Sequence, residues 1–453
     1  MKNQFIYTLY TLVLFCVSLG FASCDNDPDD DELRPLPQAR RTVLIYMCAE
    51  NSLGSSGYHR SDSIEIMKGR EFISSGDRLL MYIDDHKNPR LYQVDATSDS
   101  PKLVRQWNEE LCSASPETLQ QVLTWTAQKF PADEYGLVMW SHADGWIPAQ
   151  NPSVDSSEVP VLKSKQAPFA PYSWGIDVGA SGSMSTDKGA DGKLGEQMDI
   201  DNMAQAIEQS GVHLKYIFFD ACMMQTLEVG YALRHATDYV IASPIAITAY
   251  GANYTHQLQC GLFSADVTDI VKTYHADIID PYQANLYSDS GIVFAVVKTS
   301  ALEQLAQATN MALQLSDINA DNIPDLEGAQ HYHTYTSHYY YRPHQYDARM
   351  AMQHVLTPQA FALYDEALRQ AVVAQVATAR FWAGPSYYGY MDVDTVNYCG
   401  VSAFIPQEIY TQNAGRCPYG DLNQAFLQTE WSKVAGWQTL LQDEAGWTKS
   451  RIR

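Results

Sequence analysis

The chain contains six short, continuous hydrophobic runs that alternate with stretches of helical periodicity. A continuous run is typical of a strand that is buried on both faces of a mainly parallel sheet. The sequence therefore predicts a layered α/β fold, in which helices flank a mainly parallel central sheet. The six predicted strands cover residues 42–50, 78–85, 136–142, 216–222, 239–243 and 292–299.

Helix-capping residues mark two of the stretches between these strands. Residues 115–130 begin with Ser115 as the N-cap and Pro116 in the first turn. Residues 198–211 end on Gly211, which is a C-cap signal. Further helical patterns cover residues 224–236, 299–316, 357–380 and 430–442.

The N-terminal residues have the features of an export signal. Lys2 supplies a positive charge, a hydrophobic stretch covers residues 5–21, and small residues lead to Cys24. The stretch is short and is soon followed by acidic residues, so we predict a signal peptide at residues 1–23 instead of a membrane span. Residues 24–40 are acidic and contain three prolines, which is typical of a solvated tether.

The cysteine at the end of this signal resembles that of a bacterial lipoprotein. The resemblance implies cleavage before Cys24 and a lipid on its thiol, which would anchor the protein in a membrane. The acidic run that follows resembles the surface-export signal of Bacteroides-type lipoproteins, although a plain solubilising linker explains the same residues. We therefore expect an outer-membrane lipoprotein that faces the periplasm or the cell surface.

Composition narrows the range of functions. The 453 residues include 30 Lys and Arg against 53 Asp and Glu, a net charge of −23. Because the chain has no basic excess to neutralise phosphates, this balance argues against a nucleic-acid partner. The 46% of hydrophobic residues excludes general disorder. None of the eight cysteines stands in a CxxC pair, so neither a zinc knuckle nor a thioredoxin-type site is expected.

Two of the predicted strands end on residues that can carry out acyl transfer. The third ends at His142 and the fourth at Cys222. Ligands of open α/β sheets bind beyond the carboxyl ends of the strands, so both side chains are expected at the ligand-binding edge. The helical pattern at 224–236 follows Cys222 directly, and its N-terminal dipole would favour the nucleophilic thiolate. Taken alone, a Cys at a strand end is more often a small buried hydrophobic residue.

Together, the strand-ending His-x-x-Gly-Trp and Asp-Ala-Cys motifs resemble those of the clostripain family of cysteine peptidases, which are relatives of the caspases and gingipains. The resemblance extends from Thr42 to Leu441. It implies a caspase-like three-layer sandwich with a catalytic core at residues 41–300, an irregular loop at 147–197, and a C-terminal part of the same peptidase region at 301–453. The further stretches that resemble the family are residues 42–53, 175–177, 198–207, 239–254 and 400–406.

The resemblance also assigns roles to individual residues. Cys222 would be the nucleophile and His142 the catalytic base and acid, a Cys-His dyad that hydrolyses peptide bonds through an acyl-enzyme. The backbone N–H groups of Ala143 and Cys222 would form the oxyanion hole. Asp220 and Ser243 would contribute to the pocket for the P1 side chain, the one that precedes the cleaved bond. The implied partners are a protein or peptide substrate and, through the lipid, a membrane.

Two positions depart from the family pattern. Ala143 stands where the family usually has Gly, but a backbone N–H survives this change. After Ser243, residues 244–254 contain no acid, although arginine-specific members carry acids there. Both a basic and a neutral P1 preference therefore stay open.

Family members often cut themselves between the His and Cys strands, where residues 147–197 fit either a cleaved or an uncut loop.

Two other functions and a metal ion are compatible with parts of the sequence. A catalytically idle surface lipoprotein that binds peptide or glycan would keep the fold without needing the dyad, and a transpeptidase would use the same acyl-enzyme. No HExxH motif supports a zinc peptidase. No cofactor is certain, but calcium is possible, since residues 187–192 and 317–321 resemble calcium loops that lack the final Glu of an EF-hand.

Overall fold

The computed structural model divides the chain into two units, residues 1–36 and 37–453, and the second contains every helix and strand named below. Residues 1–32, with the expected signal peptide and most of the expected tether, lie outside the described residues. None of the helices among the described residues is long and apolar enough to span a membrane. The described residues are 33–148, 173–280, 290–319, 321–324, 326–332, 344–383, 389–412 and 421–442.

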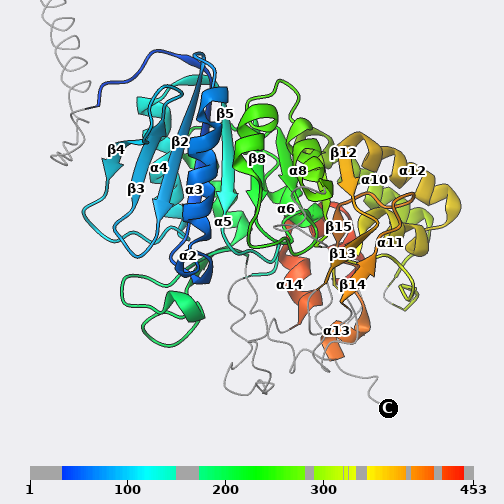
Figure 1. Ribbon diagram of the computed structural model, residues 1–453. Helices are drawn as coiled ribbons and strands as arrows, with labels where there is room; N and C mark the ends of the chain where they lie inside the picture. Colours follow the sequence, from blue (N-terminus) through cyan, green and yellow to red (C-terminus); the bar gives the residue numbers. More distant parts are fainter. Residues whose placement is uncertain are drawn as a thin grey trace, which may run out of the picture. The chain divides into compact units, whose positions relative to one another are not determined.

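A nine-stranded sheet forms the centre of the second unit (Figure 1). Its five middle strands, β9 to β2, are parallel, and two further strands extend it antiparallel at each edge. The predicted mainly parallel sheet is therefore confirmed. In order across the sheet, the strands are β12 (Val372–Ala377), β10 (Val293–Lys298), β9 (Tyr239–Ala242), β8 (Tyr216–Asp220), β5 (Ala132–Trp140), β1 (Ala39–Cys48), β2 (Asp77–Asp84), β3 (Arg90–Val94) and β4 (Lys102–Gln106).

Each of the six predicted strands forms a strand of this sheet, whereas three strands were not predicted. β3 and β4 lie at one edge, where most side chains are only partly buried or exposed and the hydrophobic signal is weak. The helix predicted over residues 357–380 is wrong in its second half. Helix α12 (Pro358–Ala371) ends in the middle of the predicted range. Strand β12 follows it directly and contains β-branched residues that pair with β10.

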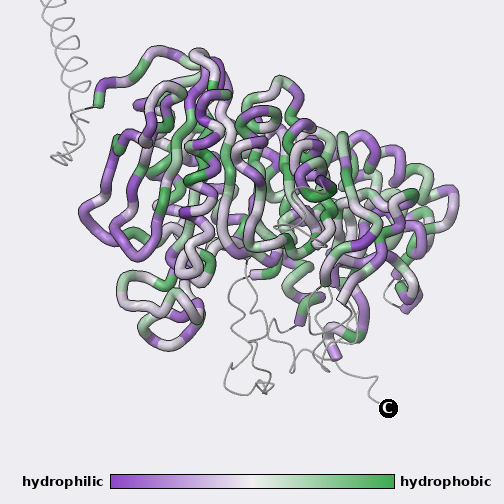
Figure 2. Tube along the Cα trace, viewed as in Figure 1, coloured by the Kyte–Doolittle hydropathy of each residue, from purple (hydrophilic) through white to green (hydrophobic). Residues whose placement is uncertain are grey.

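Helices cover both faces of the sheet, which gives three layers. Alternate strand residues such as Val43, Leu79 and Phe218 form a continuous core with Ile66 and Ile270 of the helices on one face. Figure 2 shows the central strands as predominantly hydrophobic. On this face lie α3 (Tyr58–Gly69), α7 (Tyr254–His256), the π-helical turn Gln257–Gly261 and α8 (Asp269–Ile279). On the opposite face lie α4 (Pro116–Lys129), α5 (Ile200–Gln209), α6 (Leu227–Ala232), α10 (Leu302–Leu315) and α12.

The predicted helix caps are present where the sequence places them. The Ser115 side chain accepts a hydrogen bond from the N–H of Thr118 in the first turn of α4. Gly211 has a φ of 76° just after α5, a conformation that suits glycine. Both helices therefore begin and end within two residues of their predicted bounds.

Smaller elements complete the described part of the chain. The expected irregular loop at 147–197 contains β6 (Trp174–Asp177), which pairs with β7 (Glu196–Met198), while residues 149–172 lie outside the described residues. Residues after 300 also contribute to the central sheet, because β12 belongs to it. The remaining elements are β11 (Tyr346–Asp347), β13 (Arg380–Trp382), β14 (Tyr390–Asp392), β15 (Ser402–Ala403), α11 (Ala348–Val355), α13 (Glu408–Gln412), α14 (Leu422–Gln428), α15 (Glu430–Val434) and α16 (Trp437–Gln442).

Candidate active site

The neighbouring strands β5 and β8 bring His142 and Cys222 to the same edge of the sheet. The two strands are parallel, and their last paired residues are Trp140 and Asp220. His142 and Cys222 each follow two residues later. Because neighbouring strands lie about 4.8 Å apart, the two chains leave the sheet side by side.

The His142 side chain contacts a serine that the sequence did not single out. Its Nε2 atom lies 2.9 Å from the Oγ atom of Ser52. Burial lowers the pKa of His142, and the nearby carboxylate of Asp187 partly opposes this effect. The imidazole is therefore neutral near pH 7, which is the state that can accept a proton.

Helix α2 (Ser52–Ser55) follows β1 and begins with this serine. The Asn51 side chain accepts the N–H groups of the first turn. Its amide donates to the carbonyl of Cys48 at 2.8 Å and to the Oγ of Ser141 at 3.2 Å. Ser52 is thus tied to the residue that precedes His142. The segment 42–53 contained this contact, but only the fold shows which side chain faces the imidazole.

Directly after Cys222, the chain makes a strained turn. Met223 has a φ of 60°, which is uncommon for a residue other than glycine. Its N–H donates to the carbonyl of Ile245 at 3.0 Å, which holds the turn in place. Helix α6 starts only at Leu227, after Thr226 as N-cap. The expectation that a helix follows Cys222 directly is therefore wrong.

The environment of Cys222 favours the neutral thiol. Burial, with smaller contributions from the carboxylates of Asp144 and Asp220, raises the pKa of Cys222 to about 11, and a backbone hydrogen bond with Ile247 partly opposes this rise. The N-terminus of α6, whose dipole would have favoured a thiolate, does not lie at Cys222, because α6 is short and begins five residues later. The expectation of a preformed thiolate is therefore overturned, and the thiol has to lose its proton during the reaction.

This environment predicts how Cys222 reacts as the pH changes. With a pKa near 11, the thiolate fraction rises about tenfold per pH unit below that value. We expect the rate of alkylation of Cys222 by iodoacetamide to rise steadily from pH 6 to pH 9, as measured by mass spectrometry of the modified peptide. The exposed Cys260 serves as the internal control. A plateau in the rate above pH 6 would instead show a thiolate–imidazolium pair in the resting protein.

Two backbone N–H groups at this edge have no acceptor among the described residues, those of Ala143 and Cys222. Ala143 forms a bridge with Trp174 in which the flanking residues make both hydrogen bonds, so its own N–H points away from β6. The φ of Ala143 is not positive, so alanine adopts this conformation without strain. Both N–H groups are free to bind a developing negative charge.

The loop between β9 and α7 covers the carboxyl group of Asp220. This group accepts hydrogen bonds from the N–H of Ala252 at 3.1 Å and from the hydroxyl of Tyr254 at 2.9 Å. Burial raises the pKa of Asp220 to about 6, so the group is mostly ionised at pH 7. An added Cβ at Gly251 would lie 2.6 Å from a carboxylate oxygen, so only glycine lets the loop pack this closely against the carboxylate.

Ser243 lies at the start of the same loop and is fully buried. Its Oγ accepts a hydrogen bond from the N–H of Ile245 at 3.1 Å. Its carbonyl accepts the N–H of Gln225 at 3.0 Å, which joins this loop to the turn after Cys222. The structure therefore places Ser243 where it shapes the loop from inside.

The loop at residues 187–192, which resembles a calcium loop, uses its acidic side chains within the protein. Asp187 accepts the N–H of Ser52 at 2.6 Å, and Asp191 accepts the N–H of Lys193 at 2.9 Å. Among the described residues, the group of acidic, His and Cys side chains close enough to share one ion does not include either loop of this kind. It lies instead beyond the end of β1.

Comparisons with known proteins agree with this fold. The model of the clostripain family matches residues 45–157 and 187–443. A secreted cysteine protease from Bacteroides thetaiotaomicron, solved with an irreversible peptide inhibitor, is 27% identical with a TM-score of 0.69, and the match covers 88% of this chain and 100% of that one. An inactive zymogen protease from Parabacteroides distasonis is 26% identical with a TM-score of 0.66, covering 88% and 99%. A search of curated proteins gave no match.

Proposed function

The chain belongs to the clostripain family of cysteine peptidases, and from this premise we propose that Cys222 and His142 are its catalytic dyad. The observation that carries the proposal is the position of both residues just beyond neighbouring parallel strands, beside two unused backbone N–H groups. A nucleophile, a neutral base and an oxyanion site at one edge are the parts that acyl transfer needs.

The proposed reaction begins with the neutral thiol. The Cys222 sulfur forms a bond to the substrate carbonyl carbon while His142 takes the thiol proton. The carbonyl oxygen becomes negative and accepts hydrogen bonds from the N–H groups of Ala143 and Cys222, each worth about 3–4 kcal/mol in the transition state. His142 then gives the proton to the departing amine. Water attacks the acyl-enzyme, and the acid product and the free thiol are released.

Ser52 is proposed to position His142. Its Oγ contacts the Nε2 atom of the ring, its N–H donates to Asp187, and Asn51 caps the helix that it begins. A hydroxyl can donate to or accept from either imidazole tautomer, so Ser52 can keep this contact while the ring exchanges a proton.

We propose that Asp220 forms the floor of the P1 pocket and that Ser243 shapes its wall from behind. The described partners of the Asp220 carboxylate are the neutral donors Ala252 and Tyr254. A buried carboxylate without a cation is unfavourable, and a Lys or Arg side chain of the substrate that reaches Asp220 would supply one. Asp220 alone therefore supports a basic P1 preference, despite the absence of acids in residues 244–254.

The Asp220→Asn variant tests this assignment. We expect its kcat/KM for peptides with Lys or Arg at P1 to fall about 10- to 100-fold, whereas values for neutral P1 residues change less than about threefold. A peptide library cleaved by both proteins gives the comparison. Equal losses for basic and neutral substrates would show that Asp220 supports the fold and does not read the P1 side chain.

Product analysis tests the proposed reaction against its two alternatives. We expect a peptide substrate to give a free carboxylic acid and an amine, even with an added amine present. Transfer of the acyl group to the added amine as the main product would assign a transpeptidase instead. Peptide binding without any cleavage by the full chain would assign an idle binding protein.

We also propose that the protein is exported and lipid-anchored through Cys24. The support lies in the sequence of residues 1–32, which is outside the described residues, and in the secreted relative from Bacteroides thetaiotaomicron. The acidic tether would hold the catalytic part away from the membrane surface and leave it accessible to peptide substrates.

A further inference from the structure

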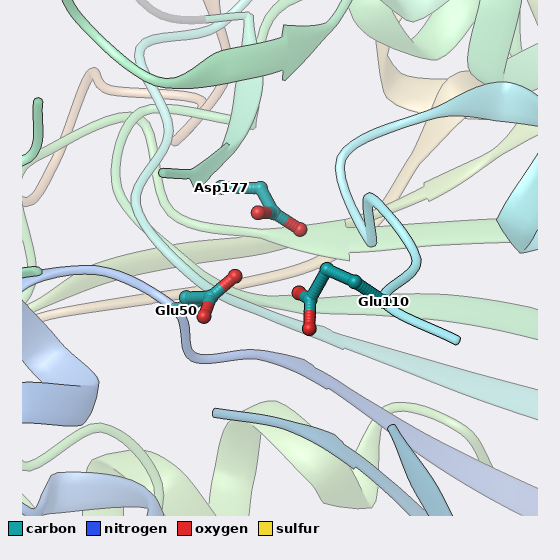
Figure 3. Close-up of side chains that lie close together, drawn as sticks. All are labelled: Glu50, Glu110 and Asp177. Carbon is teal, nitrogen blue, oxygen red and sulfur yellow. The ribbon is translucent and has the colours of Figure 1, made fainter. Parts of the chain in front are cut away.

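Two groups of acidic side chains lie near the carboxyl edge of the sheet. The first lies beyond the end of β1, and its members point toward one another (Figure 3): Glu50, Glu110 and Asp177. The second lies under α3, on the face of the sheet that carries Trp140 and Tyr254. It consists of Asp62 and Glu65 of α3 and Asp220 at the end of β8. The proposed function uses Asp220 alone, so the two acids of α3 have no assigned role.

The carboxyl group of Asp62 is connected to Asp220 through the tryptophan of the neighbouring strand. Its Oδ2 atom accepts a hydrogen bond from Nε1 of Trp140 at 2.7 Å. Trp140 is the residue of β5 that pairs with Asp220 of β8, so the Trp140 and Asp220 side chains lie side by side on the sheet. Asp62 is 2% exposed, and Trp140 is the one hydrogen-bond partner of its carboxyl group in the described part of the chain. Asp62 is therefore buried at the end of the sheet where Asp220 lies.

The segment that covers Asp220 is also bound to α3. The N–H of Tyr254 donates to Oε2 of Glu65 at 3.0 Å, and the hydroxyl of Thr255 donates to the Glu65 carbonyl at 2.9 Å. The hydroxyl of Tyr254 donates to Asp220 at 2.9 Å. α3, β8 and the start of α7 therefore enclose the carboxyl groups of Asp62 and Asp220 together.

No positive side chain in the described part of the chain forms an ion pair with Asp62. Three side chains of its own helix can carry a positive charge. His59 lies 3.3 Å from the carboxylate of Asp85, and Arg60 and Lys68 are exposed. The enclosed acids therefore lack a counter-charge from the protein itself.

The neighbours of Asp62 keep its carboxyl group protonated. The titratable groups that face it are Glu65 of α3, Asp220 of β8 and Tyr254 of α7, which are acidic or neutral. His256 of α7 is bound instead to a carboxylate of α8. Burial raises the pKa of Asp62 to about 9, and the charges of Asp220 and Glu65 contribute to the rise. Asp62 is therefore neutral at pH 7.5, whereas Asp220, with a pKa of about 6, is ionised.

We propose that Asp62 is a second acid of the P1 pocket, and that it gives up its proton when a basic P1 side chain binds beside Asp220. The inference rests on the proposed role of Asp220 and extends the pocket to α3. A guanidinium or ammonium group next to Asp220 favours the charged form of Asp62, whose O–H bond breaks while the proton passes to the buffer. Asp62 then supplies the second negative charge that residues 244–254 lack. A neutral P1 side chain leaves it protonated.

The Asp62→Asn variant tests the proposal, because asparagine keeps an oxygen that can accept the bond from Trp140 but cannot ionise. We expect its kcat/KM for peptides with Arg at P1 to fall about tenfold, and the value for Met at P1 to change less than about twofold. The matched control, Asp133→Asn, removes an exposed acid at the other end of β5 and should behave like the parent with both peptides. Equal losses for the two peptides in Asp62→Asn would overturn the proposal and assign a structural role.

A second measurement counts the proton directly. The Cys222→Ala protein is titrated at pH 7.5 with a peptide amide that ends in arginine, by calorimetry in two buffers that differ in ionisation enthalpy. We expect release of about one proton per bound peptide, and none for a peptide amide that ends in methionine. Addition of Asp62→Asn to this protein should abolish the release. Binding of the arginine peptide without release of a proton would overturn the proposal.

Failure of this proposal can be told from failure of the proposed function. If Asp220→Asn leaves the P1 preference unchanged, the P1 pocket itself is wrongly assigned and the role of Asp62 falls with it. If Asp220→Asn loses the preference for basic residues and Asp62→Asn keeps it, the pocket stands and only the role of Asp62 is contradicted.

Discussion

The His142→Ala variant is expected to lose roughly 10⁴- to 10⁶-fold in kcat/KM with peptide substrates, and Cys222→Ala at least as much. The loss is large because the Cys222 thiol, with a pKa near 11, is almost entirely protonated at neutral pH. It needs a neighbouring base in the transition state. The double variant should be no slower than the slower single variant, because each residue is useless to the reaction without the other.

Two comparisons make this result specific. Cys260→Ala removes an exposed thiol and should keep kcat/KM within about twofold. In the His142→Ala variant, iodoacetamide should still alkylate Cys222 at high pH, since the thiol then ionises without a base. Strictly multiplicative losses in the double variant would contradict a dyad, because they would show two independent contributions.

The second large effect concerns stability, at the opposite end of the sheet. Arg41 is 1% exposed and donates to the carboxylate of Glu134 at 2.6 Å and to the carbonyls of Leu262 and Ser264 at 3.0 and 2.7 Å. Its removal leaves two carbonyls without this donor. It also removes the hydrogen bonds that connect β1 with β5 and with the turn after α7. We expect Arg41→Met to lower the free energy of unfolding by about 3 kcal/mol, measured by urea denaturation.

The matched control removes a charged side chain that is exposed to water. Lys272 pairs with Asp266 and Asp269 on the surface, so Lys272→Ala should leave the urea denaturation midpoint almost unchanged. The Glu134 side chain is 35% exposed, which keeps the Arg41 effect below that of a fully buried pair. An Arg41→Met protein as stable as the parent would show that water replaces the lost donors.

Much of the fold follows from local patterns in the sequence. Strands buried on both faces have continuous hydrophobic runs, and for this reason the middle of the sheet could be predicted together with the caps Ser115 and Gly211. β4 was missed because an edge strand has few hydrophobic residues. The sequence predicts the end of a helix at residues 372–377, since a period of 3.6 and a short β-branched run are hard to separate at a boundary.

The candidate site divides in the same way. That His142 and Cys222 lie at neighbouring strand ends could be predicted, since the carboxyl ends of parallel strands meet at one edge. The contact of Ser52 with His142 depends on distant segments, which no local pattern reveals. The start of α6 was misplaced because the left-handed Met223 leaves no signature in the residue types. The state of the thiol depended on that start, and so it was also predicted wrongly.

The most direct test is to locate the covalent adduct formed with a peptide acyloxymethyl ketone, an inhibitor that is attacked by a catalytic thiol. Mass spectrometry of the digested protein should place the adduct on Cys222, and both Cys222→Ala and His142→Ala should abolish or strongly slow its formation. The other thiols of the described chain should stay unmodified. An adduct on another cysteine, or equal labelling of the Cys222→Ala protein, would contradict the assignment of Cys222 as the nucleophile.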